Sequence, residues 1–581
     1  MEEFLMNMYP YLDAMKEILE SDPDAKRQFL SIYEPVTVCT PLADARRELR
    51  VMADGELTCY GSLDKKDVED KGVAAYLSSR DCGMSWKLKY KSPDDLMGAA
   101  VQSPYTGRWI TVRGNMVYLD DGDGARYHKI TERPLNCMFQ PIFLTHRNRC
   151  LVAGQIAELG NPPTVLYSDD NGETWTTVIL PIPPRYEVTW PDRDVRWLEC
   201  GSEPSIVELP DGRLMMLLRN AWDRFYVSYS SDDGETWTEC EPSVFYSTIT
   251  TPHIYRLSDG RVLCTWCNTT PFPEFNHNLQ PETREYCRSG KGEDAFTNRD
   301  AAHAAITCDG KTWEGFREVL LNPIRNEPDF RIAGGKASSR DKSIHQSQIL
   351  ELPYNKIMVY FGQHTVSRRV VIFDLDWLLE DGREENFDTG LSHLSTQTYV
   401  KSLADTYVRF GFPGHCAWNR TDGPLLMPDP TEYGKESLQL CRIDDPRLIS
   451  PAQGAVWNFP SARKGSVEID LQVLGEGIRI TLADRWLNPV DPSVRDRCPL
   501  SFVADKQVTE DDKRHTLRIE WDLDDTVAHV FLDGVKKFRV PFRYTAGDLA
   551  PVGLSYLHLQ SDASAPDPQG TYVAALRMKK A

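Results

Sequence analysis

The chain lacks long apolar runs and paired cysteines. No stretch approaches the roughly 18 apolar residues that cross a membrane, and the first residues lack the basic and apolar regions of a secretory signal. The 14 cysteines are scattered, and Cys264 and Cys267, the nearest to a CxxC pair, have no second pair of ligands at the spacing that a zinc site needs. We therefore expect a cytoplasmic protein with reduced thiols, no metal, no cofactor and no membrane partner.

Positive charge is scarce as well. The 66 Lys and Arg residues are outnumbered by 86 Asp and Glu residues, which gives a formal net charge of -20. Nucleic acids and anionic membranes attract clustered Lys and Arg, so neither is an expected partner. Net charge says little about a single site, and a local basic pocket for a small anion stays open.

What the sequence does contain is a repeated eight-residue turn, the Asp box. The pattern Ser-x-Asp-x-Gly-x-Ser/Thr-Trp begins at Ser79, Ser168 and Ser230, and a fourth copy from Thr307 keeps its Gly-x-Thr-Trp half. The Asp can accept hydrogen bonds from backbone N–H groups of its own turn, Gly allows positive φ, and Trp packs the turn onto a sheet. Each copy is expected to join the two outer strands of a four-stranded sheet.

Apolar hairpins alternate with the boxes. Five of them begin near residues 47, 137, 203, 253 and 345, with turns such as Asp211-Gly212 and Asp259-Gly260. The repeated order of hairpin, outer strand, box and final strand is typical of the blades of a β-propeller. We expect a sixth blade from residues 100–130 or 390–430.

A chain of 581 residues is too long for one core, and the patterns predict an all-β protein in three parts. Residues 1–32 show the apolar spacing of a short N-terminal helical segment. Residues 33–428 are expected to form a six-bladed β-propeller that carries the active site. Residues 429–581 have evenly spaced strands and Gly, Asp and Pro turns, which predict a β-sandwich of the jelly-roll or concanavalin-like type. It would serve as a sugar-binding module or as a packing domain.

Over roughly residues 40–400 the boxes and hairpins resemble the sialidase (neuraminidase) superfamily of Asp-box, or BNR-repeat, β-propellers. The resemblance implies a six-bladed propeller and glycoside hydrolysis. The boxes specify the fold more than the activity, because similar boxes occur in other glycosidases and in binding proteins.

The expected topology gathers polar residues at one mouth of the propeller channel. Boxes and hairpin turns share one face, so residues that open the first strand of a hairpin or close the second lie at the other face. These residues are Gln140, Gln155, Glu203, Arg219, Asn220, His253, Asn268, His345, Gln346, Gln363 and His364. A concave polar cluster of this kind suits a ligand rich in hydroxyl groups.

The segment 202–220 is similar to the sialidase hairpin that a Glu opens and an Arg closes. The resemblance implies that Glu203 is the general base for a tyrosine nucleophile and that Arg219 belongs to a triad that binds the substrate carboxylate. An Arg fork binds a carboxylate bidentately. The alternative is that Glu203 and Arg219 only pair with each other across the hairpin.

Other family positions have several candidates. Arg46 or Arg47 matches the first arginine of the sialidase family. Asp64, Asp67 or Asp70 matches its acid/base residue, and Arg368 or Arg369 matches a later arginine. Tyr354, Tyr360, Tyr399 and Tyr407 are open as nucleophiles. The predicted catalytic residues are Glu203, Asp67, His345 and His364. The predicted substrate-binding residues are Arg47, Arg219, Asn220, His253, Asn268, Gln346, Gln363 and Arg368.

The sequence thus predicts an exo-acting glycoside hydrolase that releases a terminal sugar, with acidic sugars among the candidates. Its partner would be an oligosaccharide or glycoside, and a homo-oligomer is compatible with the sequence. Without a Tyr/Glu pair, Glu203 and an Asp from 64–70 would serve as the two carboxyl groups. Because neutral imidazole works near pH 7, the histidines leave a polysaccharide lyase or an atypical glycosidase as alternatives, beside a non-catalytic carbohydrate-binding propeller.

Overall fold

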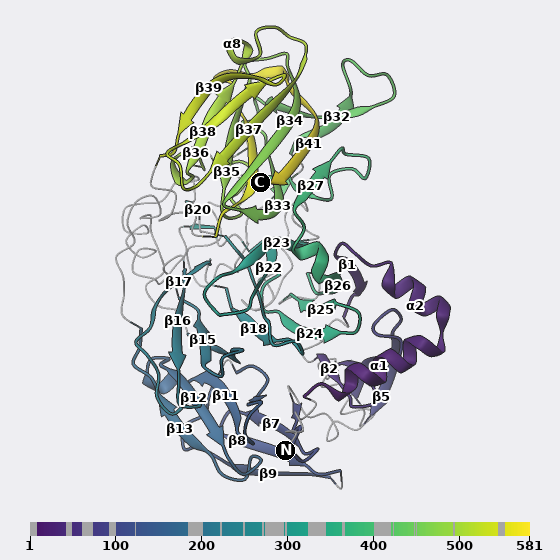
Figure 1. Ribbon diagram of the computed structural model, residues 1–581, viewed down its shortest axis with the longest axis vertical. Coiled ribbons are helices and arrows are strands. Elements are labelled where there is room, and N and C mark those ends of the chain that lie inside the picture. Colours follow the sequence, from purple (N-terminus) through teal and green to yellow (C-terminus); the bar gives the residue numbers. More distant parts are fainter. Residues whose placement is uncertain are drawn as a thin grey trace.

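The chain is almost entirely β-structure in a computed structural model (Figure 1). The structure describes residues 8–41, 49–60, 74–91, 100–122, 124–136, 138–183, 202–220, 224–247, 250–269, 272–273, 295–296, 299–322, 344–362, 367–399, 420–421, 423–446, 448, 450–491, 494–543 and 552–581. No helix among these residues has the length and apolar content needed to span a bilayer.

Two helices open the described chain, inside the segment expected to be helical. They are α1 (Pro10–Ser21) and α2 (Pro23–Leu30), each with Pro in its first turn, where the missing N–H costs nothing. The Asp22 carboxylate caps α2 by accepting from the N–H groups of Asp24 and Ala25. One side of α1, including Met15 and Leu19, is fully buried against the first and last sheets.

Six antiparallel four-stranded sheets follow, and four of them are built from four consecutive strands, whereas β20 (Phe272–Pro273) and β21 (Ala295–Phe296) interrupt the fifth and β1 (Val36–Cys39) completes the last. The first three contain β2 (Leu49–Val51), β3 (Leu57–Tyr60), β4 (Ala74–Ser79) and β5 (Lys87–Lys91); β6 (Val101–Gln102), β7 (Trp109–Arg113), β8 (Met116–Asp120) and β9 (Ala125–Lys129); β10 (Ile142–Phe143), β11 (Cys150–Gln155), β12 (Pro163–Ser168) and β13 (Thr176–Ile179). The next three contain β14 (Ser205–Glu208), β15 (Leu214–Leu218), β16 (Arg224–Ser230) and β17 (Glu241–Tyr246); β18 (His253–Arg256), β19 (Val262–Trp266), β22 (Ala301–Thr307) and β23 (Glu314–Leu321); β24 (Gln348–Leu352), β25 (Lys356–Phe361), β26 (Arg369–Asp374) and β1 (Val36–Cys39). Of the two ranges expected to supply a further blade, the first forms the sheet β6 to β9.

Neighbouring sheets share hydrophobic cores. Separate buried clusters join the second sheet to the third, the third to the fourth, the fourth to the fifth and the fifth to the last. Another cluster joins the first sheet to the last, and β1 pairs with β26, so the start of the chain is the edge strand of the last sheet. Four-stranded sheets joined side by side in this way fit a propeller.

The Asp boxes make the local contacts that the pattern predicts. In the box from Ser230, Asp232 Oδ1 accepts from Thr236 N at 2.8 Å, and Ser230 Oγ accepts from Gly234 N at 2.9 Å. Gly234 has φ +91°, and a Cβ there would lie 2.7 Å from Leu151 Cδ2 on the preceding sheet. The box therefore closes its own turn and also packs on the neighbouring sheet.

Hairpin turns and boxes lie at the same rim of the sheets, as expected. Arg149, just before β11, donates to the carbonyl of Asp233 at 3.1 Å and pairs with Glu235 at 3.1 Å, both in the box of the next sheet. We call this rim, defined by the boxes that begin at Ser79, Ser168, Ser230 and Thr307, the Asp-box rim.

The C-terminal part consists of an eight-stranded and a five-stranded sheet. The larger contains β27 (Gly382–Glu385), β31 (Leu425–Pro428), β32 (Glu436–Arg442), β34 (Lys464–Val473), β37 (Arg514–Asp522), β38 (Val527–Leu532), β39 (Val535–Pro541) and β41 (Asp567–Lys580). The smaller contains β28 (Leu394–Ser395), β33 (Gly454–Ala462), β35 (Ile478–Ala483), β36 (Leu500–Ala504) and β40 (Leu554–Ser561). The chain already enters these sheets at Gly382, ahead of the expected boundary at 428, because β27 pairs with β41.

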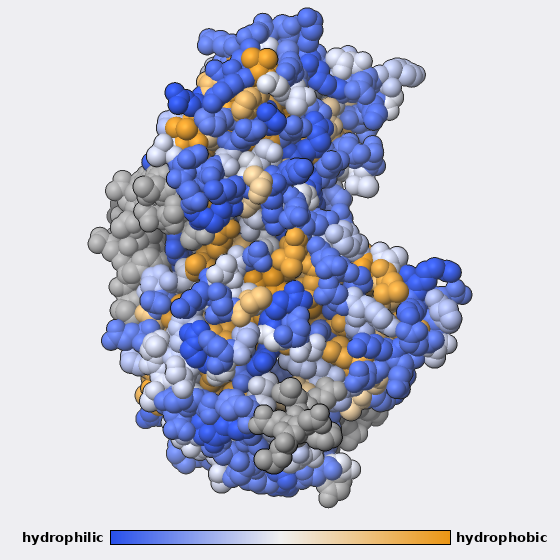
Figure 2. Space-filling model, in the orientation of Figure 1, coloured by the Kyte–Doolittle hydropathy of each residue, from blue (hydrophilic) through white to orange (hydrophobic). Residues whose placement is uncertain are grey.

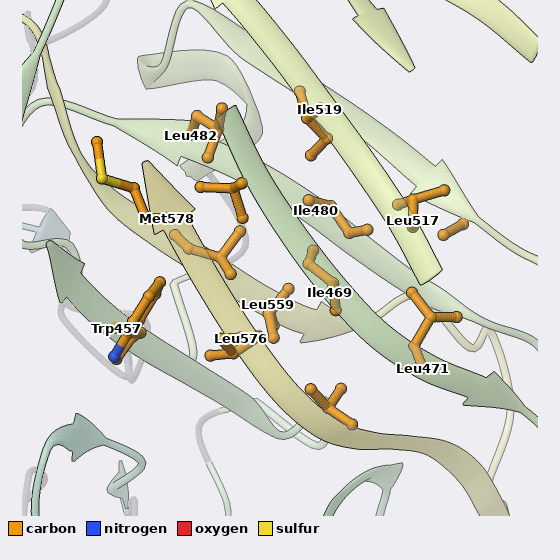
Figure 3. Packing of buried hydrophobic residues seen from close by; sticks show 14 of the residues in the cluster. Trp457, Ile469, Leu471, Ile480, Leu482, Leu517, Ile519, Leu559, Leu576 and Met578 are labelled. Carbon is orange, nitrogen blue, oxygen red and sulfur yellow. The ribbon is translucent and has the colours of Figure 1, made fainter. Parts of the chain in front are cut away.

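One core lies between the two C-terminal sheets (Figure 3). Ile469 and Leu517 come from the larger sheet and Ile480 and Leu559 from the smaller, and all are buried. Along β34 buried and partly exposed residues alternate, as they do in a strand with one face on a core.

Short elements complete the described chain, namely the 3-10 turn Ala157–Leu159, the helices α5 (Leu375–Leu378), α7 (Val494–Arg497) and α8 (Lys506–Thr509), and the two-stranded pairs β20 (Phe272–Pro273) with β21 (Ala295–Phe296) and β29 (Thr398–Tyr399) with β30 (Arg420–Thr421). The C-terminal sheets stand against β22 and β23 (Figure 1). Hydrophilic residues cover most of the face in Figure 2, and apolar residues gather toward its middle.

Candidate functional site

The first strands of all six sheets line one cavity of about 600 Å³. Each of them contributes apolar side chains, namely Val51, Val101, Ile142, Ile206, Ile254 and Leu350. The polar lining residues include Gln140 and His253, which the sequence had assigned to the channel. The six sheets thus surround a common space, with walls that are more apolar than the sequence analysis indicated.

The N-terminal segment lies at the Asp-box end of this cavity. Residues 8–11 are part of its lining, the Tyr9 hydroxyl donates to the Arg256 carbonyl at 2.8 Å, and the Tyr11 and Tyr255 hydroxyls are 3.1 Å apart. Burial raises the pKa of all three tyrosines well above the usual value, so their hydroxyls stay protonated and can donate. We call this end the closed end.

Glu203 and Arg219 meet at the other end of the strands. Arg219 Nη1 lies 3.1 Å from Glu203 Oε2, and the Thr251 hydroxyl donates to the same oxygen at 2.5 Å. The backbone N–H of Arg219, just after β15, also donates to the carbonyl of Ser202, just before β14, at 2.7 Å. The structure therefore brings Glu203 and Arg219 together, and we call their position the Glu203 rim.

Glu203 is held in an uncommon conformation. Its φ is +35°, a left-handed value that costs a residue with a Cβ free energy, and its side chain is largely buried. The Gln155 side chain accepts from Glu203 N at 3.0 Å and so fixes the strained backbone. Strain of this kind gathers at functional sites, where surrounding contacts impose it.

The Glu203 rim adjoins the cavity. Pro204 and Ser205, the next two residues after Glu203, line it, as does His253, two residues after Thr251. Ser205 Oγ accepts from Ile254 N at 3.2 Å and joins the two neighbouring strands. Glu203 and Arg219 thus lie next to the cavity without being among the residues that line it.

Asn268 has a different environment from the one expected. It is 1% exposed, its side-chain nitrogen donates to the Asp484 carbonyl at 3.0 Å, and its own carbonyl accepts from Trp486 N at 2.9 Å. Asn268 N donates to His303 Nδ1 at 3.0 Å. The structure therefore makes Asn268 a contact between the propeller-like sheets and the C-terminal sheets, not an exposed substrate ligand.

The remaining predicted residues are only partly placed. Asn220 donates from its side chain to the Arg224 carbonyl. His345 is buried and Gln346 has φ +69°, both just before β24, and Arg368 lies beside Gly362 just before β26. Arg47, Asp67, Gln363 and His364 lie outside the described residues, and their roles stay predictions.

Tyr354 and Tyr360, two of the four candidate nucleophiles, lie away from Glu203. The Tyr354 hydroxyl donates to Glu20 of α1 at 2.6 Å, on the Asp-box side. Tyr360 is fully buried in the core between the first and last sheets. The side chain of Tyr399 and all of Tyr407 lie outside the described residues.

Sequence reasoning missed Thr251 and the tyrosines at the closed end. Thr251 stands in a short polar run before β18 and carries no motif, and Tyr9 lies in a segment that reads only as an amphipathic helix. In the part of the chain that the structure describes, no group of three or more His, Cys, Asp or Glu side chains could hold a metal ion.

Comparison with known families gives one match. Residues 47–322 match the family model described as a BNR repeat-like domain. No curated protein matches the chain.

Several solved structures are similar at low identity. A Trypanosoma rangeli sialidase in complex with sialic acid is 11% identical, with 92% of this chain and 91% of that chain covered and a TM-score of 0.32. A protein of unknown function from Dyadobacter fermentans is 18% identical, with 59% and 97% covered and a TM-score of 0.35. The NanB sialidase from Streptococcus pneumoniae is 14% identical, with 60% and 70% covered and a TM-score of 0.35. At these values the likenesses support no activity for this chain.

Proposed function

We propose that the chain, whose residues 47–322 match the model of a BNR repeat-like domain, belongs to the sialidase-like superfamily and is an exo-acting glycoside hydrolase. It releases a terminal sugar, with acidic sugars as the first candidates, from an oligosaccharide. The observation that carries the proposal is the Glu203–Arg219 pair, which is strained, largely buried and next to a cavity lined by all six sheets.

The proposal includes the architecture. The six four-stranded sheets are the blades of a six-bladed propeller, with β1 closing the last blade, and the two C-terminal sheets form a β-sandwich. A cytoplasmic location is proposed from the scattered cysteines alone.

In this proposal Glu203 accepts a proton and Arg219 binds an anionic group of the substrate. The guanidinium 3.1 Å away favours the ionised carboxylate, and the Thr251 hydroxyl fixes its orientation. Arg219 presents a planar fork that binds a sugar carboxylate bidentately. A second carboxyl group from residues 64–70 completes a two-carboxylate scheme.

The closed end favours attack on a chain end. Tyr9 and Tyr11, held by Arg256 and Tyr255, stand at the Asp-box end of the cavity, where they obstruct a polysaccharide that enters from that side. A terminal sugar enters from the Glu203 rim, and the rest of the oligosaccharide stays outside.

A non-catalytic carbohydrate-binding propeller is the second candidate. It is favoured by the same pair, because Glu203 already has Arg219 and Thr251 as partners and is 8% exposed. In that case both side chains would serve to shape a binding surface.

The test is a panel of aryl glycosides, including aryl glycosides of acidic sugars, assayed with wild type, Glu203→Gln and Glu351→Gln. Glu351 is a matched control, because it is a partly buried carboxylate near the closed end that accepts from Ser258 N and Oγ at 2.6 Å. Hydrolysis should fall at least about 100-fold in Glu203→Gln and persist in Glu351→Gln. Affinity for a sugar without turnover in any of the three proteins would replace the hydrolase with the binding propeller.

A further inference from the structure

A loop of the C-terminal sheets reaches the sheet next to the one that carries Glu203 and Arg219. The loop follows β35, and its first residues dock on the end of β19, where Asp484 and Trp486 exchange hydrogen bonds with Asn268 at 3.0 and 2.9 Å. Thr269 and Trp486 also form a parallel β-bridge. The two parts of the chain are therefore joined by backbone contacts on both sides of Arg485.

Arg485 is buried at this junction, with 1% of its side chain exposed, and Nη1 pairs with Asp484 Oδ1 at 2.7 Å. Its guanidinium lies 3.9 Å from the centre of the Tyr246 ring at the end of β17. The Arg224 guanidinium lies 4.6 Å from the same ring centre, and its Nη2 donates to the Tyr246 hydroxyl at 2.9 Å. One aromatic ring thus receives a guanidinium from each part of the molecule.

The same contacts continue to the candidate site. The carbonyl of Arg224 accepts from the Asn220 side chain. Asn220 directly follows Arg219, which pairs with Glu203 at 3.1 Å. A chain of contacts therefore leads from Arg485 through Tyr246, Arg224 and Asn220 to the Glu203–Arg219 pair.

We propose that Arg485 is a positioning residue through which the C-terminal sheets set the geometry of the Glu203–Arg219 site. A guanidinium suits this task, because it is planar, always charged and stacks on an aromatic face, whereas an ammonium group offers only a point charge. Burial strengthens both the stacking and the ion pair, since little water screens them. The C-terminal sheets are accordingly part of the site's support and not a detachable sugar-binding module.

The kinetic consequence of this proposal rests on the proposed hydrolase function, whereas its structural consequence does not. If Arg485 holds Tyr246 and Arg224, its loss frees the segment 202–220 without touching substrate. Because Arg219 binds the substrate and Arg485 acts only on the placement of Arg219, the effect should appear mainly in KM.

The test compares Arg485→Met with two further variants and a control. Asp484→Asn/Arg485→Met removes both charges together and leaves no buried carboxylate without its partner. Arg485→Lys keeps the charge and loses the planar stack. Arg479→Met is the control, because Arg479 lies on β35, the strand just before the loop that carries Arg485, and pairs with Asp562 at 2.8 Å.

Backbone hydrogen exchange should rise within 202–220 in Arg485→Met and in the double variant, including the Arg219 amide that bonds to Ser202. It should rise less in Arg485→Lys and not in Arg479→Met. On a glycoside that the wild type hydrolyses, KM should increase about tenfold while kcat changes less than about threefold. If the Arg485 variants fail to fold, Tyr246→Leu tests the same link from the propeller side and should give the same pattern.

Unchanged exchange at 202–220 in folded Arg485 variants would overturn the proposal. So would an equal rise in Arg479→Met, which would show a general loosening of the C-terminal sheets. If the wild type hydrolyses no glycoside, the proposed function fails, and the exchange measurement still decides whether Arg485 positions this segment.

Discussion

At the Asp-box rim the same local contacts recur in several sheets, whereas the contacts that hold Glu203 at the other rim come from three separate parts of the chain. Asp170 and Asp232 each accept from a Thr N–H of their own box at 2.8 Å, and the box glycines pack on the preceding sheet. Glu203, by contrast, is held by Arg219 from its own hairpin and by Thr251 and Gln155 from elsewhere.

The difference separates scaffold from site. A repeated local contact stabilises a turn and its packing, because it is the same in each sheet that carries a box. A set of contacts that occurs once, strains a backbone and borders a cavity is the arrangement that chemistry requires. We expect substitutions at the Asp-box rim to change stability and substitutions at the Glu203 rim to change activity.

Acid should affect the contacts at the junction with the C-terminal sheets at a higher pH than the contacts of the Asp boxes. Burial lowers the pKa of His303, which bonds Asn268 and Tyr556 at the junction with the C-terminal sheets, to about 3. The unfolded chain protonates this histidine below about 6.5, so the free energy of unfolding should fall as pH drops from 6.5 to 3, by up to about 5 kcal/mol. Urea titrations at several pH values measure this fall in the free energy of unfolding.

A second acid step belongs to the Asp boxes. For Asp309 burial raises the pKa, but hydrogen bonds from Thr312 and Lys311 outweigh it and lower the pKa to about 2. Its contribution should persist until pH falls below about 3.8. His303→Asn should flatten the first step and Asp309→Asn the second. An unchanged first step in His303→Asn would contradict the assignment.

The box glycines should matter for stability through packing as well as through φ. Gly234→Ala should lower the free energy of unfolding by about 3 kcal/mol, because the new Cβ would lie 2.7 Å from buried Leu151 Cδ2 and φ is +91°. Gly212→Ala is the matched control, with φ +85° and no atom within 4 Å of the new Cβ, and should cost about 1 kcal/mol. Equal losses in urea denaturation would mean that the packing on the preceding sheet adds nothing.

The hairpin β14–β15 allows the two rims to be compared within one element. Arg219→Lys, at the Glu203 rim, should lower kcat/KM about 30-fold, which corresponds to the roughly 2 kcal/mol of a lost charged hydrogen bond. Arg213→Lys, at the turn of the same hairpin, should leave kcat/KM unaltered, because Arg213 bonds Asp211 of its own turn and lies over the Tyr229 ring, at the Asp-box rim. Steady-state kinetics of both variants on the best glycoside provides the measurement, and similar losses in the two would count against the division.

The closed end should give the smallest effect. Tyr11→Phe removes a buried hydroxyl that bonds Tyr255 and should cost about 1 kcal/mol of stability. Tyr354→Phe removes a hydroxyl that bonds Glu20 at the surface and should cost close to nothing. Thermal unfolding of the two variants checks the difference, and a reversed order would argue against the buried contact.

The sequence could predict the parts whose partners are near in the chain. Asp232 bonds Ser230 and Thr236 within one turn, and Glu203 and Arg219 close one hairpin, so a local pattern indicates both. Asn268 and Asp484 are 216 residues apart, and Tyr9 and Arg256 are 247 apart. No local pattern indicates such pairs, because they follow from how separately formed sheets and helices pack.

The most direct test of the division between scaffold and site compares kcat/KM of Glu203→Gln with kcat/KM of Asp232→Asn. Each value is taken relative to wild type, at a temperature where all three proteins are folded. The Glu203 variant should lose at least about 100-fold, and the Asp232 variant, though less stable, should keep the wild-type value. Equal values for the two variants would show that the Glu203 rim is scaffold like the rest.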